Sequence, residues 1–478
     1  MRLMIAGGGG FRVPLVYRAL CTGPYAGLVS ELVLYDVDAA RLAGIEAVLR
    51  NMPLAEGVRP RVRVSTELQE SLTGTQVVFA AIRPGGTAGR VIDERVALDL
   101  GLLGQETTGA GGISYALRSI PRMLELAEAM RQHCPDAWLI NFTNPAGMVT
   151  EALVPALGHR VIGICDSAGA LVHRAAAAAG APLQDGTLDG VGYFGLNHLG
   201  WLYRLAPAGR DLLPGLLTDH AALASFEEGR LFDPRVLEKL GCLPNEYLYY
   251  YYETEHATRA ILQQSRTRGT SIHQQQDSLY PALPGSPNPY ERWEAARLSR
   301  EEGYMAEART QGGRRDEEDL AGGGYERVAL AVMRALAGGS SQGRDGTQLG
   351  SAPTRLILNV PNAPVVSAGR PAEAVTLEGE AKVAVPGLPA DAVVEVPCEV
   401  TPDGAMPLAQ ERPGGQFLTL MQHVKEVERL TIRAVRDGDR DAALQAFAMH
   451  PLVGSAALGR QLLEGYEHAF PELKGLWK

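Results

Sequence analysis

The sequence predicts an α/β protein with a doubly wound parallel sheet in its N-terminal part and a mixed α+β domain after it. Three observations lead to this fold class. Short apolar runs alternate with amphipathic stretches over the first 165 residues, a glycine cluster follows the first run, and the alternation stops near residue 170. Because 478 residues exceed the usual size of one hydrophobic core, we expect two domains, residues 1–170 and 171–478.

Five apolar runs predict the strands of the parallel sheet, because strands buried on both faces have continuous apolar sequences. They are residues 3–6, 32–35, 77–82, 138–141 and 161–164. Helix-like segments separate them; residues 119–133, for example, carry an apolar stripe and a proline near the start. Strands and helices in alternation predict a doubly wound sheet.

The second part of the chain does not continue this alternation. An alanine run at 175–179 predicts a helix interior, and residues 325–336 and the segment from Gln416 to the end are also helix-like. Residues 375–400 alternate apolar and polar residues, which predicts antiparallel strands. Glycine-rich, charged stretches at 311–324 and 338–350 predict surface loops. We therefore expect a mixed α+β domain.

The composition limits which classes of partner and which cellular compartment are expected. The net charge is −10 without a dense basic run, which argues against nucleic acid and anionic membranes as partners. No apolar stretch has the length of a membrane span. The five cysteines are scattered without a C-x-x-C pair, as in proteins of a reducing compartment. We expect a soluble, cytoplasmic protein with a small-molecule ligand.

The glycine cluster predicts a dinucleotide site. The first predicted strand runs into Gly7, Gly8, Gly9 and Gly10, followed by Phe11 and Arg12 at a helix start, where a pyrophosphate can bind. The strict G-x-G-x-x-G pattern is not met. Asp36 ends the second predicted strand about 26 residues after Gly10, near the spacing of a ribose-binding carboxylate, and favours NAD over NADP. The alternative is a glycine-rich turn with a surface aspartate.

Seven further segments occur in order along the chain. They are residues 82–86 (IRPGG), 104–112 (GQETTGAGG), 141–147 (NFTNPAG), 163–166 (GICD), 195–201 (GLNHLGW), 246–251 (EYLYYY) and 358–362 (LNVPN). Together they resemble glycoside hydrolase family 4, whose members are NAD- and divalent-metal-dependent glycosidases, and most closely its 6-phospho-β-glucosidases. The resemblance implies a Rossmann-like N-terminal domain, similar to that of lactate and malate dehydrogenases, and a second domain for substrate, metal and oligomer contacts.

The resemblance implies that Cys165 and His198 bind a divalent metal, commonly Mn²⁺. Their positions in the sequence alone do not predict a metal site, because a buried cysteine is usually a small core residue and a lone histidine is usually structural. A thiolate and an imidazole would leave coordination positions open for substrate oxygens.

The resemblance also implies a mechanism that differs from that of two-carboxylate glycosidases. Hydride transfer from sugar C3 to NAD makes the C2 proton acidic, and a base removes that proton beside the metal. The aglycone then leaves by elimination, and water addition and re-reduction complete the hydrolysis. Tyr247 is the expected base and Tyr250 the reserve; the alternative for either is a tyrosine that packs one helix face.

The remaining candidates are expected in the substrate pocket, Glu106 and Asn197 because their segments match the family's motifs. Asn144 is expected to contact sugar hydroxyls or the nicotinamide ribose, unless it only forms a turn. Arg83 is a candidate both for the cofactor and, through the 6-phosphate, for the substrate. The other substrate candidates are Glu106, Asp166 and Asn197, and, for the 6-phosphate, Arg95 and Arg268.

Several alternatives stay open. Asp166 after the metal cysteine fits no subgroup pattern fully, so a 6-phospho-α-glucosidase or another family 4 α-glycosidase competes with the β-enzyme that the tyrosine-rich segment favours. A 2-hydroxy acid dehydrogenase that uses NAD on the same fold, or a non-catalytic NAD-binding subunit, is also possible. Members of the family usually form homodimers or homotetramers.

Overall fold

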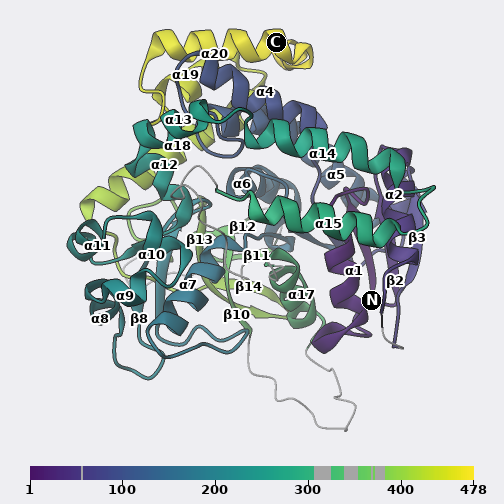
Figure 1. Ribbon diagram of the computed structural model, residues 1–478, viewed down its shortest axis with the longest axis horizontal. Helices are drawn as coiled ribbons and strands as arrows, with labels where there is room; N and C mark the ends of the chain where they lie inside the picture. The colour runs from purple at the N-terminus through teal and green to yellow at the C-terminus, as the bar shows by residue number, and fades with distance from the viewer. Residues whose placement is uncertain (55–56, 306–323, 339–353, 368–369, 372–382) are drawn as a thin grey trace.

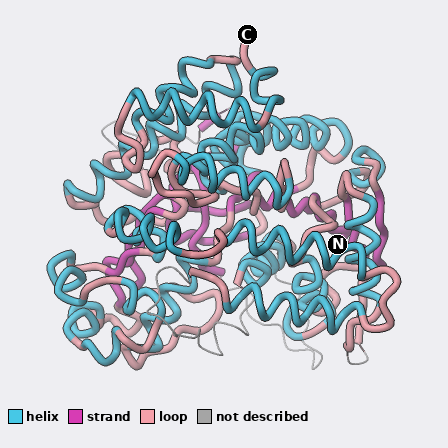
Figure 2. The backbone as a smooth tube through the Cα atoms, turned by 45° about the horizontal axis from the view of Figure 1, so that its top comes forward, coloured by secondary structure: helices cyan, strands magenta, loops and turns pink. Residues whose placement is uncertain are grey.

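The computed structural model describes residues 1–54, 57–305, 324–338, 354–367, 370–371 and 383–478. Within this part of the chain, twelve strands form one sheet in the order β3-β2-β1-β4-β5-β6-β10-β13-β7-β8-β9, with β14 paired to β13. Figure 2 shows the strands running through the middle of the molecule with helices on both sides. The sheet is therefore the frame on which the candidate site is built.

The N-terminal part of the sheet is parallel, and its strand order 3-2-1-4-5-6 is that of a Rossmann-like doubly wound fold. The prediction is confirmed, and each predicted strand is present. The strands are β1 (Arg2–Ala6), β2 (Glu31–Tyr35), β3 (Arg61–Ser65), β4 (Val77–Ala80), β5 (Trp138–Asn141) and β6 (Val161–Gly163). Only β3 was missed, because this edge strand alternates arginine with valine and has no continuous apolar run.

Helices cover both faces of the parallel sheet, and the strands supply apolar side chains to both. In β1, Leu3 and Ile5 face one core cluster, and Met4 and Ala6 face the other. The helices are α1 (Val13–Cys21), α2 (Ala39–Arg50), α3 (Leu68–Leu72), α4 (Gly86–Asp99), α5 (Ala110–His133), α6 (Ala146–Leu157) and α7 (Ser167–Ala178). Alternation of side chains across the sheet thus builds two cores from one strand.

Helix α5 begins at Ala110 and not at the predicted Ser119, and Pro121 lies inside it. The predicted helix over 119–133 is confirmed, but its predicted start was wrong, because Gly111 and Gly112 disfavour a helix by propensity. In the structure they allow close packing instead: a Cβ at Gly111 would lie 2.1 Å from the carbonyl oxygen of Gln105.

The second part of the chain extends the same sheet with antiparallel strands. Asn359 of β10 pairs with Gly163 of β6, so the sheet is continuous across residue 170. The strands are β7 (Val191–Leu196), β8 (Leu199–Leu205), β9 (Leu243–Pro244), β10 (Thr354–Pro361), β13 (Val393–Thr401) and β14 (Gly404–Pro407), with a separate pair β11 (Val365–Ser367) and β12 (Arg370–Pro371). Antiparallel strands are confirmed for 393–400; residues 375–382 lie outside the described part.

Helices of the second part pack back onto the first. Helices α14 and α15 lie against α2, and α18–α20 lie over α4 and α5 (Figure 1). The helices are α8 (Leu213–Thr218), α9 (His220–Leu223), α10 (Glu227–Leu231), α11 (Pro234–Leu240), α12 (Tyr249–Tyr252), α13 (Thr254–Gln263), α14 (Arg268–Ala282), α15 (Pro289–Glu302), α17 (Tyr325–Leu336), α18 (Gly415–Asp437), α19 (Arg440–Met449) and α20 (Ala456–Ala469). The predicted helices at 175–179, 325–336 and after 416 are confirmed, the first as the end of α7. Of the predicted loops, residues 311–323 and 339–350 lie outside the described part.

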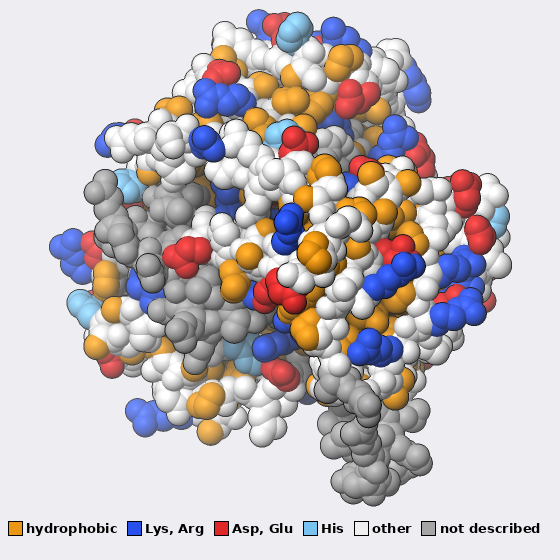
Figure 3. All heavy atoms as spheres, turned by 45° about the vertical axis from the view of Figure 1, so that its right-hand side comes forward, with side chains coloured by type: hydrophobic (Ala, Val, Ile, Leu, Met, Phe, Trp, Pro, Cys, Tyr) orange, Lys and Arg blue, Asp and Glu red, His pale blue; other side chains and the backbone are white. Residues whose placement is uncertain are grey.

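Three features of the structure relate to the predictions about partners and compartment: the surface charge, the cysteines and the apolarity of the helices. Basic and acidic side chains are interspersed on the face drawn in Figure 3. All five cysteines are buried and free. Among the helices that the structure describes, none combines the length and apolarity needed to cross a bilayer.

Candidate active site

The glycine loop lies at the carboxyl ends of β1, β2 and β4, where doubly wound sheets bind ligands. Gly7 has a φ of 91°, and a Cβ there would lie 2.6 Å from the carbonyl oxygen of Ala81. A Cβ at Gly8 would lie 2.7 Å from the backbone of Leu34. The loop therefore needs glycine to pass between the ends of β2 and β4.

The backbone N–H groups of the four glycines are already used inside the protein. Those of Gly7 and Gly8 donate to the carbonyl oxygen of Tyr35, that of Gly9 to Asp36 Oδ2, and that of Gly10 to the carbonyl oxygen of Gly7. The N–H groups of Phe11 and Arg12, just before helix α1, have no acceptor among the described residues. These two groups, at a helix N-terminus, are the free donors for an anion.

Three aromatic side chains of the second part hold the loop by its carbonyl groups. The Tyr280 hydroxyl donates to Gly9 O at 2.7 Å, the Trp293 indole to Phe11 O at 2.8 Å, and the Tyr325 hydroxyl to Arg12 O at 3.0 Å. These residues come from α14, α15 and α17. The shape of the loop thus depends on elements that lie far from it in the sequence.

A cavity of about 800 Å³ opens beside the loop. Asp36 lies in its wall, and burial raises the pKa of this carboxyl while hydrogen bonds from the backbone of Asp38 and Gly9 oppose the rise. Gly8 and Gly9 do not line the cavity. The predicted cofactor residues that do are Gly7, Gly10, Phe11, Arg12, Asp36, Arg83 and Asn144.

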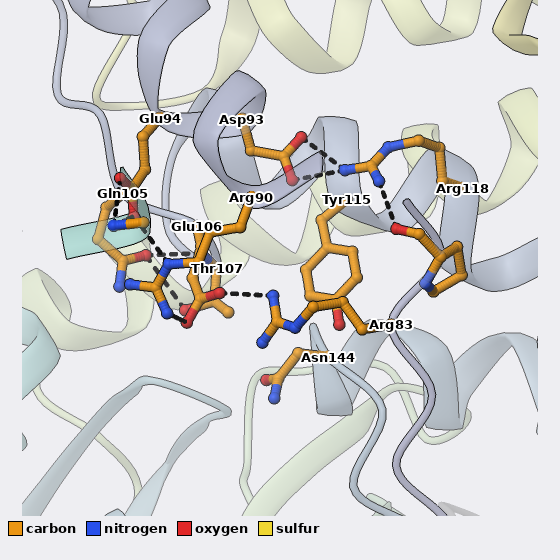
Figure 4. A network of polar contacts seen from close by, with 12 residues as sticks. Arg83, Arg90, Asp93, Glu94, Gln105, Glu106, Thr107, Tyr115, Arg118 and Asn144 are labelled. Carbon is orange, nitrogen blue, oxygen red and sulfur yellow. Dashed lines mark hydrogen bonds and ion pairs between the residues drawn. The ribbon is translucent and has the colours of Figure 1, made fainter. Parts of the chain in front are cut away.

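Glu106 joins two arginines of the cavity wall (Figure 4). Its carboxylate accepts from Arg83 Nη1 at 2.6 Å and from Arg90 Nη1 at 2.7 Å. Burial opposes ionisation, but the charges of Arg83 and Arg90 outweigh it and lower the pKa of Glu106 to about 2. Glu106 is therefore ionised at neutral pH.

Arg300, which also lines this cavity, lies within the electrostatic influence of three other arginines. Burial, and then the charges of Arg12, Arg268 and Arg90, lower the pKa of Arg300 to about 9. The Nε of Arg300 is buried and has no hydrogen-bond partner among the described residues. Arg268 donates to the carbonyl oxygen of Arg300 at 3.4 Å. A partly buried guanidinium among like charges fits an anionic ligand such as a phosphate.

The structure does not bring Arg95 to this site. Its side chain is 52% exposed and forms an ion pair with Asp99. Arg90 and Arg95 are both on α4, but five helical residues turn the direction of the side chain by roughly 140°. Arg90 therefore faces the cavity while Arg95 faces solvent.

Cys165 and His198 lie at strand ends of the same sheet. Cys165 follows β6, and His198 lies in the two-residue turn between β7 and β8 with a φ of 62°. Burial lowers the pKa of His198 to about 3, against the charge of Glu106, so the imidazole is neutral. Burial, and then the charges of Glu395 and Asp166, raise the pKa of the Cys165 thiol.

These residues fit a divalent cation that keeps open coordination positions. The neutral imidazole of His198 offers a lone pair, and a nearby cation would favour the thiolate of Cys165. No group of three or more His, Cys, Asp or Glu side chains suited to a metal exists in the part of the chain described. Two protein ligands leave coordination positions open for substrate oxygens or water. The buried Oδ1 of Asn197, next to His198, lacks a partner among the described residues and could face such a ligand.

Tyr247 lies against His198, with ring centroids 3.7 Å apart and planes 6° apart. Burial, and then the charges of Glu246, Cys165 and Glu106, raise the pKa of Tyr247 well above its usual value. The Tyr304 hydroxyl lies 3.3 Å from that of Tyr247. The ring of Tyr250 is tilted against that of Tyr247, with centroids 6.3 Å apart.

Two models of one protein family match most of the chain. Residues 2–179 match the model described as "Family 4 glycosyl hydrolase", and residues 193–453 match "Family 4 glycosyl hydrolase C-terminal domain". The chain belongs to glycosyl hydrolase family 4. The resemblance inferred from the sequence motifs is therefore confirmed.

Relatives within family 4 carry both anomeric names. A probable 6-phospho-beta-glucosidase of Bacillus subtilis is 26% identical over 97% of this chain and 95% of its own. A 6-phospho-alpha-glucosidase of Lacticaseibacillus paracasei is 32% identical over 53% of this chain and 62% of its own. The solved 6-phospho-beta glucosidase from Thermotoga maritima with NAD and glucose-6-phosphate has a TM-score of 0.77, with 25% identity over 99% of both chains.

The remaining predicted residues of this family 4 chain lie near the same site. Asn144 lines the large cavity, and Asn197 lines a smaller one together with His198. Asp166 precedes α7 and touches Gly324, since a Cβ at Gly324 would lie 2.6 Å from Asp166. The sequence analysis missed Arg90, Arg300, Tyr304 and Glu395. Only Arg90 carried a signal, because it follows the IRPGG segment on a helix that begins there.

Proposed function

We propose that this protein hydrolyses 6-phospho-β-glucosides with NAD and a divalent metal, Mn²⁺ in the first instance. The observation that carries the proposal is the stacking of Tyr247 on His198, beside an arginine-lined cavity that begins at a dinucleotide-type glycine loop. Glu106 links the two regions: it pairs with Arg83 and Arg90 of the cavity, and its charge acts on both His198 and Tyr247.

NAD fits the large cavity by the chemistry of its walls. The free N–H groups of Phe11 and Arg12 would bind the pyrophosphate, and Asp36 would bind the adenosine ribose. A 2′-phosphate would be repelled by Asp36, so we expect NAD and not NADP. The relative from Thermotoga maritima was solved with NAD and glucose-6-phosphate, which supports this pair of ligands.

The 6-phosphate would bind at Arg300 and the arginines that act on it. Arg300 has an unpartnered buried Nε, and Arg12, Arg90 and Arg268 act on it as like charges. A phosphate dianion would relieve this repulsion and accept charge-assisted hydrogen bonds. Arg83 and Asn144, which also line the cavity, would contact the sugar or the nicotinamide ribose.

The side chains of the protein would then bind the metal and remove the proton from C2 of the sugar. When bound, NAD supplies a reversible hydride acceptor and Mn²⁺ supplies Lewis acidity at the sugar oxygens. Cys165 and His198 would hold the metal, and the lone pair of neutral His198 is available for this. Tyr247 would remove the proton from C2. Its raised pKa means that the phenol needs the nearby cation to ionise.

The α-anomer is the second candidate. Asp166 directly follows Cys165, and its charge acts on both Cys165 and Arg12. A carboxyl next to the candidate metal ligand is the type of group that serves as a general acid for a leaving oxygen. Relatives named 6-phospho-alpha-glucosidases occur beside those named 6-phospho-beta-glucosidases.

The experiment measures p-nitrophenol release from p-nitrophenyl 6-phospho-β-glucoside and from its α-anomer, with NAD and Mn²⁺ added together and omitted in turn. We expect cleavage of the β-substrate that requires both additions and is abolished by EDTA. Cleavage of the α-substrate alone would establish the second candidate. Cleavage that is independent of NAD would overturn the proposed mechanism.

We also propose a cytoplasmic homodimer or homotetramer. Light scattering on the eluting protein measures the mass, and a monomer of 51.1 kDa would contradict the proposal.

A further inference from the structure

Two buried polar residues, Asn359 and Glu395, lie side by side on neighbouring strands in the middle of the sheet. Gly163 of β6 pairs with Asn359 of β10, Asn359 with Glu395 of β13, and Glu395 with Gly195 of β7. Asn359 is 0% exposed and Glu395 is 1% exposed. The strands that flank this pair on either side, β6 and β7, lead directly to Cys165 and His198.

The carboxylate of Glu395 accepts three hydrogen bonds. Its Oε1 accepts from Nδ2 of Asn359 and from Nδ2 of Asn197, each at 3.1 Å. Its Oε2 accepts from the Tyr193 hydroxyl at 3.1 Å. One donor belongs to β10 next to the Cys165 strand, and another belongs to the turn that carries His198. The carboxylate therefore connects the supports of the two candidate ligands.

Small residues around the network leave room for it. A Cβ at Gly163 would lie 2.8 Å from Cβ of Asn359, and a Cβ at Gly147 would lie 3.1 Å from Cβ of Asn197. Two apolar side chains could fill the middle of the sheet without the desolvation of a carboxylate and two amides. A buried network that ends at a functional turn fits a role in orienting that turn better than a role in stability alone.

We propose that Glu395 is a positioning residue that holds the Asn197–His198 turn against the strand pair leading to Cys165, so that thiol and imidazole reach one divalent cation. The inference rests on the metal assignment made under the proposed function. Side chains that orient the metal ligands without contacting the metal strongly affect the affinity for that metal.

The test measures the Kd of Mn²⁺ for the full-length protein, without substrate, from the electron paramagnetic resonance signal of free Mn²⁺. Glu395→Leu removes the acceptor and should raise the Kd about 10- to 100-fold. Glu395→Gln keeps a carbonyl oxygen that can accept from both asparagines, and should stay within about threefold of the wild type. An unchanged Kd in Glu395→Leu, or an equal rise in Glu395→Gln, would overturn the positioning role.

Tyr193→Phe is the matched control, because it removes one hydrogen bond to the same carboxylate without touching the turn. We expect a lower Tm of the metal-free protein and a Kd within about threefold of the wild type. A rise in Kd as large as that in Glu395→Leu would show that any loss of rigidity in this part of the sheet weakens Mn²⁺ binding, and would overturn the inference. If Glu395→Leu does not fold, Asn359→Ala, which removes the donor on the Cys165 side, replaces it with the same expected rise.

Cys165→Ser separates this inference from the metal assignment. Loss of Mn²⁺ binding in Cys165→Ser together with an unchanged Kd in Glu395→Leu would overturn the role of Glu395 alone. An unchanged Kd in Cys165→Ser would overturn the metal assignment, and the inference with it.

Discussion

The imidazole of His198 and the phenol of Tyr247 lie parallel, with ring centroids 3.7 Å apart. Both rings are held by short local structures: a two-residue turn for His198 and the 3-10 turn Glu246–Leu248 for Tyr247. Stacking fixes the phenol beside the candidate metal ligand, so that a cation held by His198 would be close enough to act on the tyrosine hydroxyl.

The first prediction concerns the base. Tyr247→Phe should lower kcat about 10²- to 10⁴-fold, because the proton acceptor is lost while the ring still stacks on His198. Binding of NAD and Mn²⁺ should be retained, as measured by titration calorimetry. Tyr250→Phe is the control, with a loss below about tenfold; a loss in Tyr250→Phe that exceeds that in Tyr247→Phe would move the base to Tyr250.

The second prediction concerns the phosphate ligand. It compares Arg300, which the structure places in the cavity, with Arg95, which the sequence analysis proposed. Arg300→Met should raise KM for a 6-phosphorylated substrate about 30- to 1000-fold, because a buried charge partner of the phosphate is lost. The Tm without ligands should stay equal or rise, since repulsion from Arg12, Arg90 and Arg268 is removed. Exposed Arg95→Met should change neither quantity; an effect on KM there would restore Arg95 as a phosphate ligand.

The third prediction concerns the glycine loop. Gly7→Ala should destabilise the protein by about 3 kcal/mol and weaken NAD binding, because a positive φ is combined with a clash against Ala81. Urea unfolding and NAD titration measure the two effects. Gly23 is the control: its φ is also positive, at 66°, but a Cβ there would have no neighbour within 4 Å. Gly23→Ala should therefore lower the free energy of unfolding by only about 1 kcal/mol. Equal losses in both variants would contradict the steric argument.

The fourth prediction concerns pH. The pKa of Glu106 falls from 4.5 to about 2 on folding, so its ionised form stabilises the native state above pH 4.5, and this stability is lost as the pH falls toward 2. At pH 7 Glu106→Gln should be less stable than the wild type by on the order of 3 kcal/mol. The difference should shrink at pH 3 in urea unfolding. A gap that is constant from pH 7 to pH 3 would contradict the shifted pKa.

The sequence predicted the elements whose signals are local. Continuous apolar runs gave the central parallel strands, and the glycine run located the cofactor loop beside Asp36. It could not predict that the N–H groups of Gly7–Gly10 are used internally, because Gly9 reaches Asp36 only after β1 and β2 pair. Strand β3 was missed because it alternates arginine with valine and has no continuous apolar run.

Residues whose role depends on distant partners left no local signal. Arg300 stands in a charged stretch that is typical of a solvated helix, and only the packing of α15 over the glycine loop places it near Arg12. Glu395 stands in a run of valines, where its carboxylate meets Asn197 only through the pairing of β13 with β7. Both depend on contacts between segments far apart in the chain.

The continuous sheet has a consequence for exchanging parts between relatives. Strands β10 and β13 come late in the chain but lie between β6 and β7. A fragment ending at residue 179 would expose β6 as a bare edge, and a fragment beginning at 193 would expose β10. Each fragment alone would aggregate, whereas the two co-expressed fragments should reassemble along the β6–β10 seam. Chimeras built to transfer anomer preference should therefore exchange loops at the strand ends and not whole halves.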